Sequence, residues 1–541
     1  MKFHYLGGAI TKYKPIVLII LDGWGLSPSW GGNALVMNNP RNIDRLWRNY
    51  PHTILQALGA IEYGNIIGES RLGHMMIGAG RSVQGAHSRI NQEIKNRTFY
   101  KNKAIKAAFD WAKRNNSNLH LIGMISDGGV HSDVEHLLAL LNFGYREGFD
   151  RVYIDAITDG TDSPPTEALK FIEKINKKID EVKIGAFSSV IGRDYAMDRN
   201  EHWEKIQKYI NCIIDGRAEV YPNIGKAITA NYHKGKNDEF IEPALIKQKT
   251  GKTVTIKDND AVIFFNFRED RAKELAKVFL EKGFRIFLWK PKIPNNLYFL
   301  TFTKYQDNST AKIAFPSDYY AENLSEVLSN LNFKQLKVAE SEKTSHVTNF
   351  FNGGKEENFA GEERKIISSP NVTSYDKKPI LSAKEITNTV CKAINSNKYD
   401  FILVNYANVD IIAHTGNIIA VGQAVQFLDK FVQEVANTNL KFGGATIITS
   451  DHGNAEQMVS INKSYNERET IHTLNPVPFI YVNRNNKKNL IQTSISYQPN
   501  ALAKIIDATD TLADIAPTIL EILGIPKPKQ MTGHSLLNRL E

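Results

Sequence analysis

ATIITSDHG, residues 445–453, is a short apolar run, rich in β-branched residues, that ends at an acid and an imidazole. Apolar runs of this kind are typical of strands buried on both faces of a sheet. Six further runs share this form: PIVLIILDG (15–23), LHLIGMISDGG (119–129), RVYIDAITDG (151–160), VKIGAFSSVIG (182–192), AVIFFNFRED (261–270) and FILVNYANVD (401–410). Together they predict the strands of central sheets.

Helical patterns separate these runs, as in HLLALLNFGYREG (136–148) and VGQAVQFLDKFVQEVA (421–436). Alternation of strand and helix predicts an α/β fold with largely parallel sheets. A chain of 541 residues is expected to form more than one domain. Polar residues at the carboxyl ends of parallel strands are where such folds bind ligands, so those positions are the candidates for chemistry.

Composition narrows the class of protein. The chain is 42% hydrophobic and 23% charged, as soluble globular proteins are. Its two cysteines, Cys212 and Cys391, lie far apart, which argues against a disulfide framework or a zinc ribbon. The apolar segment 16–21 is only six residues long and meets Asp22, so we expect neither a signal peptide nor a membrane span, and a cytoplasmic location.

The net charge is +9, from 67 basic and 58 acidic residues. Basic residues are scattered among acids, and no RNA-recognition, zinc-finger or helix-turn-helix signature occurs, so a nucleic-acid partner is not expected. The charge fits a solvated surface, and it is also compatible with a basic cleft for a small anionic substrate.

Acids and histidines follow several of the apolar runs, and these residue types are ligands for Mn²⁺, Zn²⁺ and similar ions. NVDIIAHTG places an acid and a histidine four apart, on one face if a helix begins there; alone, this also fits an acid at a helix start beside a surface histidine. Several such positions in one α/β chain favour a dinuclear metal site, which suits phosphoryl chemistry. The candidates are Asp22, Asp410, His414, Asp451, His452 and His472.

A nucleophile and an anion clamp also have candidates. Ser70 lies in the glycine-flanked GESRLGHMMIGAGR, and a serine hydroxyl needs a base or a metal to become a nucleophile. IGRDYAMDR carries Arg193 and Arg199, while FFNFREDR carries Arg268 and Arg271, which we expect on one face of a helix start. Guanidinium groups bind phosphate or carboxylate bidentately, although salt bridges to neighbouring acids explain the spacing equally well.

Taken in order along the chain, the motifs resemble those of the cofactor-independent (2,3-bisphosphoglycerate-independent) phosphoglycerate mutases, a branch of the alkaline phosphatase superfamily. The resemblance runs from Pro15 to Leu537 through LDGWG, GHMMIGAGR, SDGGVHS, GRDYAMDR, FFNFREDRA, AESEKTSHVTNFFNGG, SPNVTSYD, NYANVD, AHTG, SDHGNAE, HTLNPVPF and MTGHSL. It implies an alkaline-phosphatase-like, metal-binding domain made of residues 1–84 and 318–541. A transferase-like, substrate-binding domain is then inserted at 88–314.

The resemblance also implies roles for individual residues. One Mn²⁺ would be bound by Asp410, His414 and His472, and a second by Asp22, Ser70, Asp451 and His452, with Zn²⁺ or Co²⁺ as alternatives. Lys343 in ESEKTSH would support the serine and the phosphate. The phosphate would be gripped by Arg268 and Arg271, and the phosphoglycerate held by His131, Asp162, Arg193 and Arg199.

The implied reaction interconverts 3-phosphoglycerate and 2-phosphoglycerate through a phosphoserine at Ser70, in glycolysis and gluconeogenesis, without 2,3-bisphosphoglycerate. Its only partner is the small substrate, and the family suggests a monomer. No nucleic acid or membrane is implied.

The chain departs from the usual family pattern at several positions. GNSEVGH is GESRLGH here, which introduces Glu69 and Arg71 beside the serine. DGRDTPP is DGTDSPP, so Thr161 stands in place of an arginine, while HSH becomes HSD with Asp133, and Ala413 replaces a glycine. Most departures fall where glycerate would be held. A metal-dependent phosphatase or phosphotransferase acting on another phosphomonoester is therefore the second hypothesis, and a non-enzymatic binding role the third.

Overall fold

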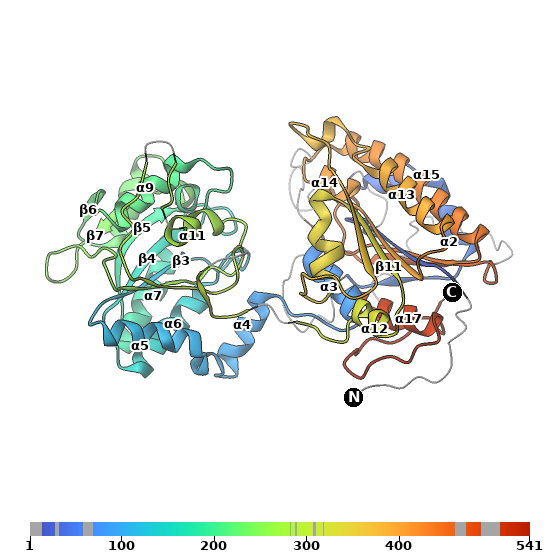
Figure 1. The fold of residues 1–541 in the computed structure, drawn as a ribbon. Coiled ribbons are helices and arrows are strands. Elements are labelled where there is room, and N and C mark those ends of the chain that lie inside the picture. The colour runs from blue at the N-terminus through green and yellow to red at the C-terminus, as the bar shows by residue number, and fades with distance from the viewer. Residues whose placement is uncertain are drawn as a thin grey trace. The chain divides into compact units, whose positions relative to one another are not determined.

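The computed structural model describes residues 13–27, 32–57, 69–281, 283–286, 289–306, 310–316, 319–459, 472–487 and 509–540. The chain forms two compact units (Figure 1). Unit 1 consists of Met1–Val83 with Asp318–Glu541, and unit 2 consists of Gln84–Ser317.

Unit 1 is built on a seven-stranded sheet in the order β12-β11-β13-β1-β14-β15-β2. The five strands from β12 to β14 run parallel, and β15 pairs antiparallel with both β14 and β2. The strands are β1 Ile16–Leu21, β2 His52–Leu55, β11 Gln335–Glu340, β12 Glu362–Ile367, β13 Phe401–Tyr406, β14 Ala445–Thr449 and β15 Val477–Val482.

Helices cover both faces of this sheet (Figure 1). The alternation of side chains along β1 shows why: Val17, Ile19 and Leu21 join one core cluster, while the intervening residues join the other. The first face packs against α1 Ala34–Met37, α2 Arg41–Asn49, α13 Ala383–Asn395, α14 Asn408–Ala413 and α15 Ile418–Lys441. The second packs against α3 Ser70–Ala79, α12 Leu324–Asn330 and α17 Ile515–Ile522.

Unit 2 contains an eight-stranded sheet in the order β10-β9-β8-β3-β4-β5-β7-β6. All neighbouring strands are parallel except β5 and β7. The strands are β3 Leu119–Met124, β4 Val152–Thr158, β5 Ala186–Gly192, β6 Glu219–Tyr221, β7 Ala244–Ile246, β8 Ala261–Phe264, β9 Tyr298–Thr301 and β10 Lys312–Ile313.

This sheet is also covered on both faces. One core includes residues of α4 Ala86–Lys95, α5 Lys103–Arg114, α6 Val134–Glu147, α7 Ala168–Val182 and α10 Ile224–His233. The other includes residues of α8 Arg193–Ala196, α9 Trp203–Ile213 and α11 Lys273–Leu280. Single-turn helices lie at Phe99–Lys101, Asp238–Phe240, Ser341–Lys343, His346–Phe350, Tyr375–Lys377 and Leu512–Asp514.

The predicted α/β class is confirmed, because both units are three-layer structures with mainly parallel sheets. Each of the seven apolar runs contains one complete strand. Within the described residues, a search for a helix long and apolar enough to cross a membrane finds none.

A buried ion pair lies inside the sheet of unit 2. His120 on β3 approaches Asp155 on β4 at 2.8 Å and Asp260 at 3.6 Å, and its side chain is fully buried. Burial opposes the charge on the imidazole, but the two carboxylates outweigh it and raise the pKa of His120 to about 9.

We expect this pair to make the stability of unit 2 depend on pH. A raised pKa contributes stability in full below the unfolded value of about 6.5, and the contribution, roughly 3 kcal/mol, is lost as pH rises through about 9. Hydrogen exchange of the β3 amides in the parent chain and in His120→Gln measures it. The difference in opening free energy should shrink with rising pH; a difference that stays constant would contradict the assignment.

Candidate active site

Several predicted site residues lie at one edge of the unit 1 sheet. Asp22 directly follows β1, Asp410 lies in the first turn of α14, which follows β13, and Asp451 lies two residues beyond β14. Lys343 lies just beyond β11 in the same way. Because β11, β13, β1 and β14 are parallel neighbours, their carboxyl ends meet, and the topology itself gathers these side chains.

Ser70 comes to this edge from a different element. It is the first residue of α3, so its hydroxyl lies at the helix N-terminus, where the free N–H groups and the helix dipole favour negative charge. Its Oγ lies 2.6 Å from His452 Nε2 and 3.4 Å from Lys343 Nζ. The close approach requires Gly73, since a Cβ there would lie 2.6 Å from the carbonyl oxygen of Asp451.

Lys343 is the cation at the centre of the described cluster. Its Nζ donates to Asp22 Oδ1 at 2.9 Å and to Asp410 Oδ2 at 2.7 Å, and its side chain is 7% exposed. Burial opposes its charge, but Asp22 and Asp410 outweigh this and raise the pKa of Lys343 well above its ordinary value. The lysine is therefore held protonated beside Ser70.

Histidines complete the cluster. His472 Nε2 lies 3.1 Å from Asp410 Oδ1, and His414 Nε2 lies 3.4 Å from the same oxygen. The Nε2 atoms of His414 and His472 are themselves 2.9 Å apart. The His472 ring also stacks on His452, with ring centres 3.8 Å apart. The two predicted ligand sets are thus contiguous.

The donors present fit divalent cations. Two groups have ligand atoms within 4.8 Å of one another, Asp22–Asp451–His452 and Asp410–His452–His472, and they share His452. Asp451 Oδ2 is buried, with His74 Nδ1 at 3.2 Å and His452 Nε2 at 3.4 Å but without a well-aligned hydrogen bond from the described residues. The buried carboxylates of Asp22, Asp410 and Asp451 also surround a single lysine, Lys343. Burial and the negative charge of Asp451 raise the pKa of Asp22. Added positive charge would relieve this repulsion, and carboxylate with imidazole suits Mn²⁺ or Zn²⁺.

The remaining predicted residues form a second cluster, in unit 2, around two acids. Asp270 approaches Arg268 Nε at 3.2 Å, Arg199 Nη1 at 3.4 Å and His131 Nδ1 at 3.5 Å. Asp162 accepts from Arg193 Nη1 at 2.8 Å and lies 4.0 Å from His131 Nε2. All of these contacts lie within one unit, so the residues that the sequence analysis predicts to hold glycerate converge.

The arginines differ in how firmly they are held. Arg193 is buried and also donates to Asp159 at 2.6 Å, whereas Arg199 and Arg268 are half exposed. Burial and then the like charges of Arg199 and Arg193 lower the pKa of Arg271, so positive charge is concentrated there. A fixed arginine beside exposed ones is suited to gripping a small anion.

One expectation about this cluster is wrong. Arg268 and Arg271 were predicted on one face of a helix start, but α11 begins only at Lys273. Arg268 lies in the irregular segment after β8, and Arg271 lies in the turn before α11, where it donates to the carbonyl oxygen of Met197 at 3.2 Å. Their convergence comes from loop packing and not from helical spacing.

Comparison with known proteins places the chain in a family. A curated protein from Francisella tularensis subsp. tularensis (strain FSC 198), named 2,3-bisphosphoglycerate-independent phosphoglycerate mutase, is 42% identical over 529 residues, covering 97% of this chain and 99% of that protein. The chain belongs to this family. A protein of the same name from Clostridium novyi (strain NT) is 43% identical with the same coverage.

Two further comparisons agree with this membership. The family model described as the BPG-independent PGAM N-terminus matches residues 90–307. A crystal structure of Leishmania mexicana phosphoglycerate mutase at low cobalt concentration aligns with a TM-score of 0.71, over 96% of this chain and 97% of that one, at 24% identity, and supports the fold. The predicted family and enzyme class are confirmed. The roles of individual site residues remain predictions.

The structure adds residues to the unit 1 cluster that the sequence analysis missed. His74 accompanies Ser70 on α3 and lies between the Ser70 carbonyl oxygen, at 2.9 Å, and Asp451 Oδ2, at 3.2 Å. Asn405 donates to Asp22 at 2.8 Å, and Asn454 donates to Asp410 at 2.9 Å. Asn405 carries a readable signal, because it is a lone polar residue inside the apolar strand FILVNY.

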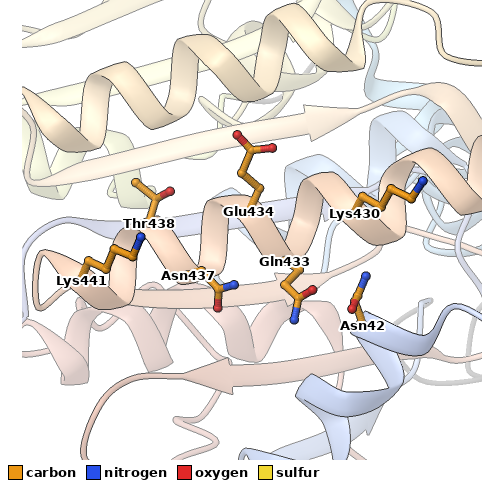
Figure 2. Close-up of a pocket in the computed structure, with 7 residues that line it drawn as sticks. All are labelled: Asn42, Lys430, Gln433, Glu434, Asn437, Thr438 and Lys441. Atoms are coloured by element: carbon orange, nitrogen blue, oxygen red, sulfur yellow. The ribbon is translucent and has the colours of Figure 1, made fainter.

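A pocket elsewhere on unit 1 is distinct from this site. It lies on the outer side of α15 (Figure 2), lined by Asn42, Lys430, Gln433, Glu434, Asn437, Thr438 and Lys441. Lys441 ends α15 just before the first residue of β14, so the pocket lies toward the amino ends of the strands. The predicted site residues of unit 1 lie at their carboxyl ends.

Proposed function

We propose that this chain interconverts 3-phosphoglycerate and 2-phosphoglycerate, with Ser70 carrying the phosphoryl group between the two halves of the reaction. The observation that carries the proposal is the position of Ser70 Oγ at the N-terminus of α3, 2.6 Å from His452 Nε2 and 3.4 Å from Lys343 Nζ. A serine so placed has a cationic partner and a helix end that favours phosphate. Such a step belongs to glycolysis and gluconeogenesis, in the cytoplasm.

Two divalent cations complete the proposed site in unit 1. Asp410, His414 and His472 would hold one, and Asp22, Ser70, Asp451 and His452 the other. Such ions lower the pKa of a bound hydroxyl and neutralise phosphate oxygens. Mn²⁺ is the first candidate, with Zn²⁺ or Co²⁺ as alternatives, since the donor types accept all three.

In unit 1, the side chains would position the acceptor and stabilise charge. Lys343, held protonated by Asp22 and Asp410, would donate to Ser70 Oγ or to a phosphate oxygen, and the free N–H groups of α3 would receive the transferred group. His74, bound to the Ser70 carbonyl oxygen, would fix the first turn of α3.

In unit 2, His131, Asp162 and the arginines at 193, 199, 268 and 271 would hold the glycerate while it reorients. Retention matters because the second hydroxyl must recover the same phosphoryl group, so positioning supplies most of the rate. The chain would act as a monomer, as the family resemblance suggests. Residues 1–84 with 318–541 would thus transfer phosphate, and 88–314 would bind substrate.

A metal-dependent phosphatase is the second candidate, favoured by Thr161. This residue is exposed in the turn before Asp162, where the family pattern has arginine. A single assay separates the two candidates: the purified chain with Mn²⁺ and no 2,3-bisphosphoglycerate should convert 3- to 2-phosphoglycerate. Release of inorganic phosphate without isomer formation would favour the phosphatase instead.

Thr161→Arg should lower KM for phosphoglycerate by about tenfold, because a charge-assisted hydrogen bond contributes about 1.5–3 kcal/mol. The backbone N–H of Thr161 already donates to Asp159, so the turn is preserved. Steady-state kinetics measure the change. An unchanged KM would mean that another residue makes the contact.

Glu69→Asn should also lower KM, by about threefold to tenfold. Glu69 occupies the N-cap of α3 without a side-chain cap, so its carboxylate adds negative charge where phosphate would bind. Asparagine removes the charge and is a favoured N-cap residue. Glu69→Gln is the control for charge alone, and an increase in KM for both variants would refute the repulsion.

A further inference from the structure

A second group of metal-ligand side chains lies in unit 2, and none of its three members is given a role in the proposed site. His87 is on α4, while Asp133 is the N-cap of α6 and His136 is in its first turn. One ligand atom from each lies within 4.8 Å of the others. The His136 side chain is fully buried, and His87 and Asp133 are partly buried.

The contacts of this group are poorly explained by hydrogen bonds alone. His87 Nε2 lies 2.7 Å from Asp133 Oδ2 and 3.0 Å from Asn91 Nδ2, and His136 Nε2 lies 3.0 Å from Asn91 Oδ1. If Asn91 donates to His87, the unprotonated His87 Nε2 faces a carboxylate oxygen, and two acceptors meet at 2.7 Å.

Exchanging the positions of the Asn91 amide oxygen and nitrogen removes the acceptor–acceptor contact but leaves a different polar group without a hydrogen-bond partner. His87 Nε2 then donates to Asp133, and Asn91 Nδ2 donates to His136 Nε2. The His136 proton must then lie on Nδ1, which is buried and has no hydrogen-bond partner among the described residues. Either arrangement leaves one polar contact unsatisfied in a buried place, which is costly.

We propose that His87, Asp133 and His136 bind a divalent cation of the zinc class. A cation among them removes the acceptor–acceptor contact, because the carboxylate oxygen and the imidazole nitrogens then direct lone pairs at positive charge. Two imidazoles and one carboxylate form a ligand set that Zn²⁺ and Co²⁺ accept. Asn91 orients the histidines, as residues behind metal ligands commonly do.

A cation at this site would stabilise the loops of unit 2 that carry His131 and Arg268. The His87 ring stacks on Phe267, with ring centres 5.2 Å apart, and Phe267 precedes Arg268. The Phe267 backbone N–H donates to the carbonyl oxygen of His131 at 2.9 Å. A cation joining α4 to the start of α6 therefore fixes the loops that present His131 and Arg268.

The count of bound Zn²⁺ tests the proposal on the full-length chain. After treatment with chelator, the parent, His87→Ala and Asp133→Asn are dialysed against Zn²⁺ and analysed for metal per chain. We expect each variant to bind one equivalent less than the parent. Asp133→Asn keeps the cap to the Glu135 N–H, so α6 should still form. Loaded with Co²⁺, the parent should show more visible absorption per chain than either variant, because the variants keep only the sites in unit 1.

His202→Ala is the matched control. His202 Nδ1 lies 3.0 Å from Asp198 Oδ1, so it is a histidine–aspartate pair in the same unit that belongs to none of the metal-ligand groups found among the described residues. This variant should bind as much Zn²⁺ as the parent. An equal metal count in the parent, His87→Ala and Asp133→Asn would overturn the proposal and leave a hydrogen-bonded cluster only.

Discussion

Ser70→Ala should reduce isomerase activity by about 10⁴-fold or more and should abolish the phosphorylated form of the protein. Loss of a catalytic nucleophile has an effect of this order in other enzymes. We propose Ser70 as the only acceptor of the phosphoryl group at the α3 N-terminus, so the variant should carry out neither half of the reaction. Coupled assays measure the rate, and acid quenching with labelled 3-phosphoglycerate followed by peptide mapping measures the phosphoserine.

Ser396→Ala is a suitable control for this loss. Ser396 lies at the C-cap of α13, and its Oγ donates to the carbonyl oxygen of Ala393 at 2.7 Å. It should keep full activity and the labelled Ser70 peptide. Persistent labelling of Ser70→Ala at another residue would remove Ser70 as the nucleophile.

Asp451→Asn should lower activity by about 10³-fold and release bound metal. Asp451 is buried, and although burial opposes its ionisation, His452 and His74 outweigh this and hold its pKa below the ordinary value. Its charge is therefore available to a cation, and metal ions supply several kcal/mol of charge stabilisation in such reactions. Activity and metal content are measured together, with Mn²⁺ added back in excess.

Asp429→Asn controls for loss of a carboxylate in the same unit. Asp429 accepts hydrogen bonds from the backbone N–H groups of Asn42 and Ile43 and belongs to none of the metal-ligand groups found among the described residues. Metal content and rate should be those of the parent. If Asp451→Asn retained both metal and rate, the assignment of Asp451 as a ligand would fail.

Much of the unit 1 cluster could be predicted from the sequence, for a topological reason. Acids that directly follow apolar runs must lie at the carboxyl edge once those runs pair in parallel, as Asp22 and Asp451 do. His452 could be expected there for the same reason. The sequence could not predict that His452 belongs to both ligand groups, because this depends on the fold placing the His472 ring against the His452 ring.

Positions set by tertiary packing were not predictable from local pattern. Ser70 reaches the site only because Gly73 lets α3 approach the backbone of Asp451. Arg268 and Arg271 have helical spacing, but an irregular segment and a turn precede α11. The spacing therefore predicted the wrong local structure for these two residues, although they do converge. The His87–Asp133–His136 group joins segments more than forty residues apart, and no short motif indicates it.

Crystallographic anomalous scattering from Mn²⁺ in the full-length protein would locate the bound cations and the residues that contact them. We expect two peaks in unit 1, one contacted by Asp410, His414 and His472, and the other by Asp22, Ser70, Asp451 and His452. Peaks elsewhere in unit 1, or a Ser70 hydroxyl out of reach of either ion, would contradict this expectation.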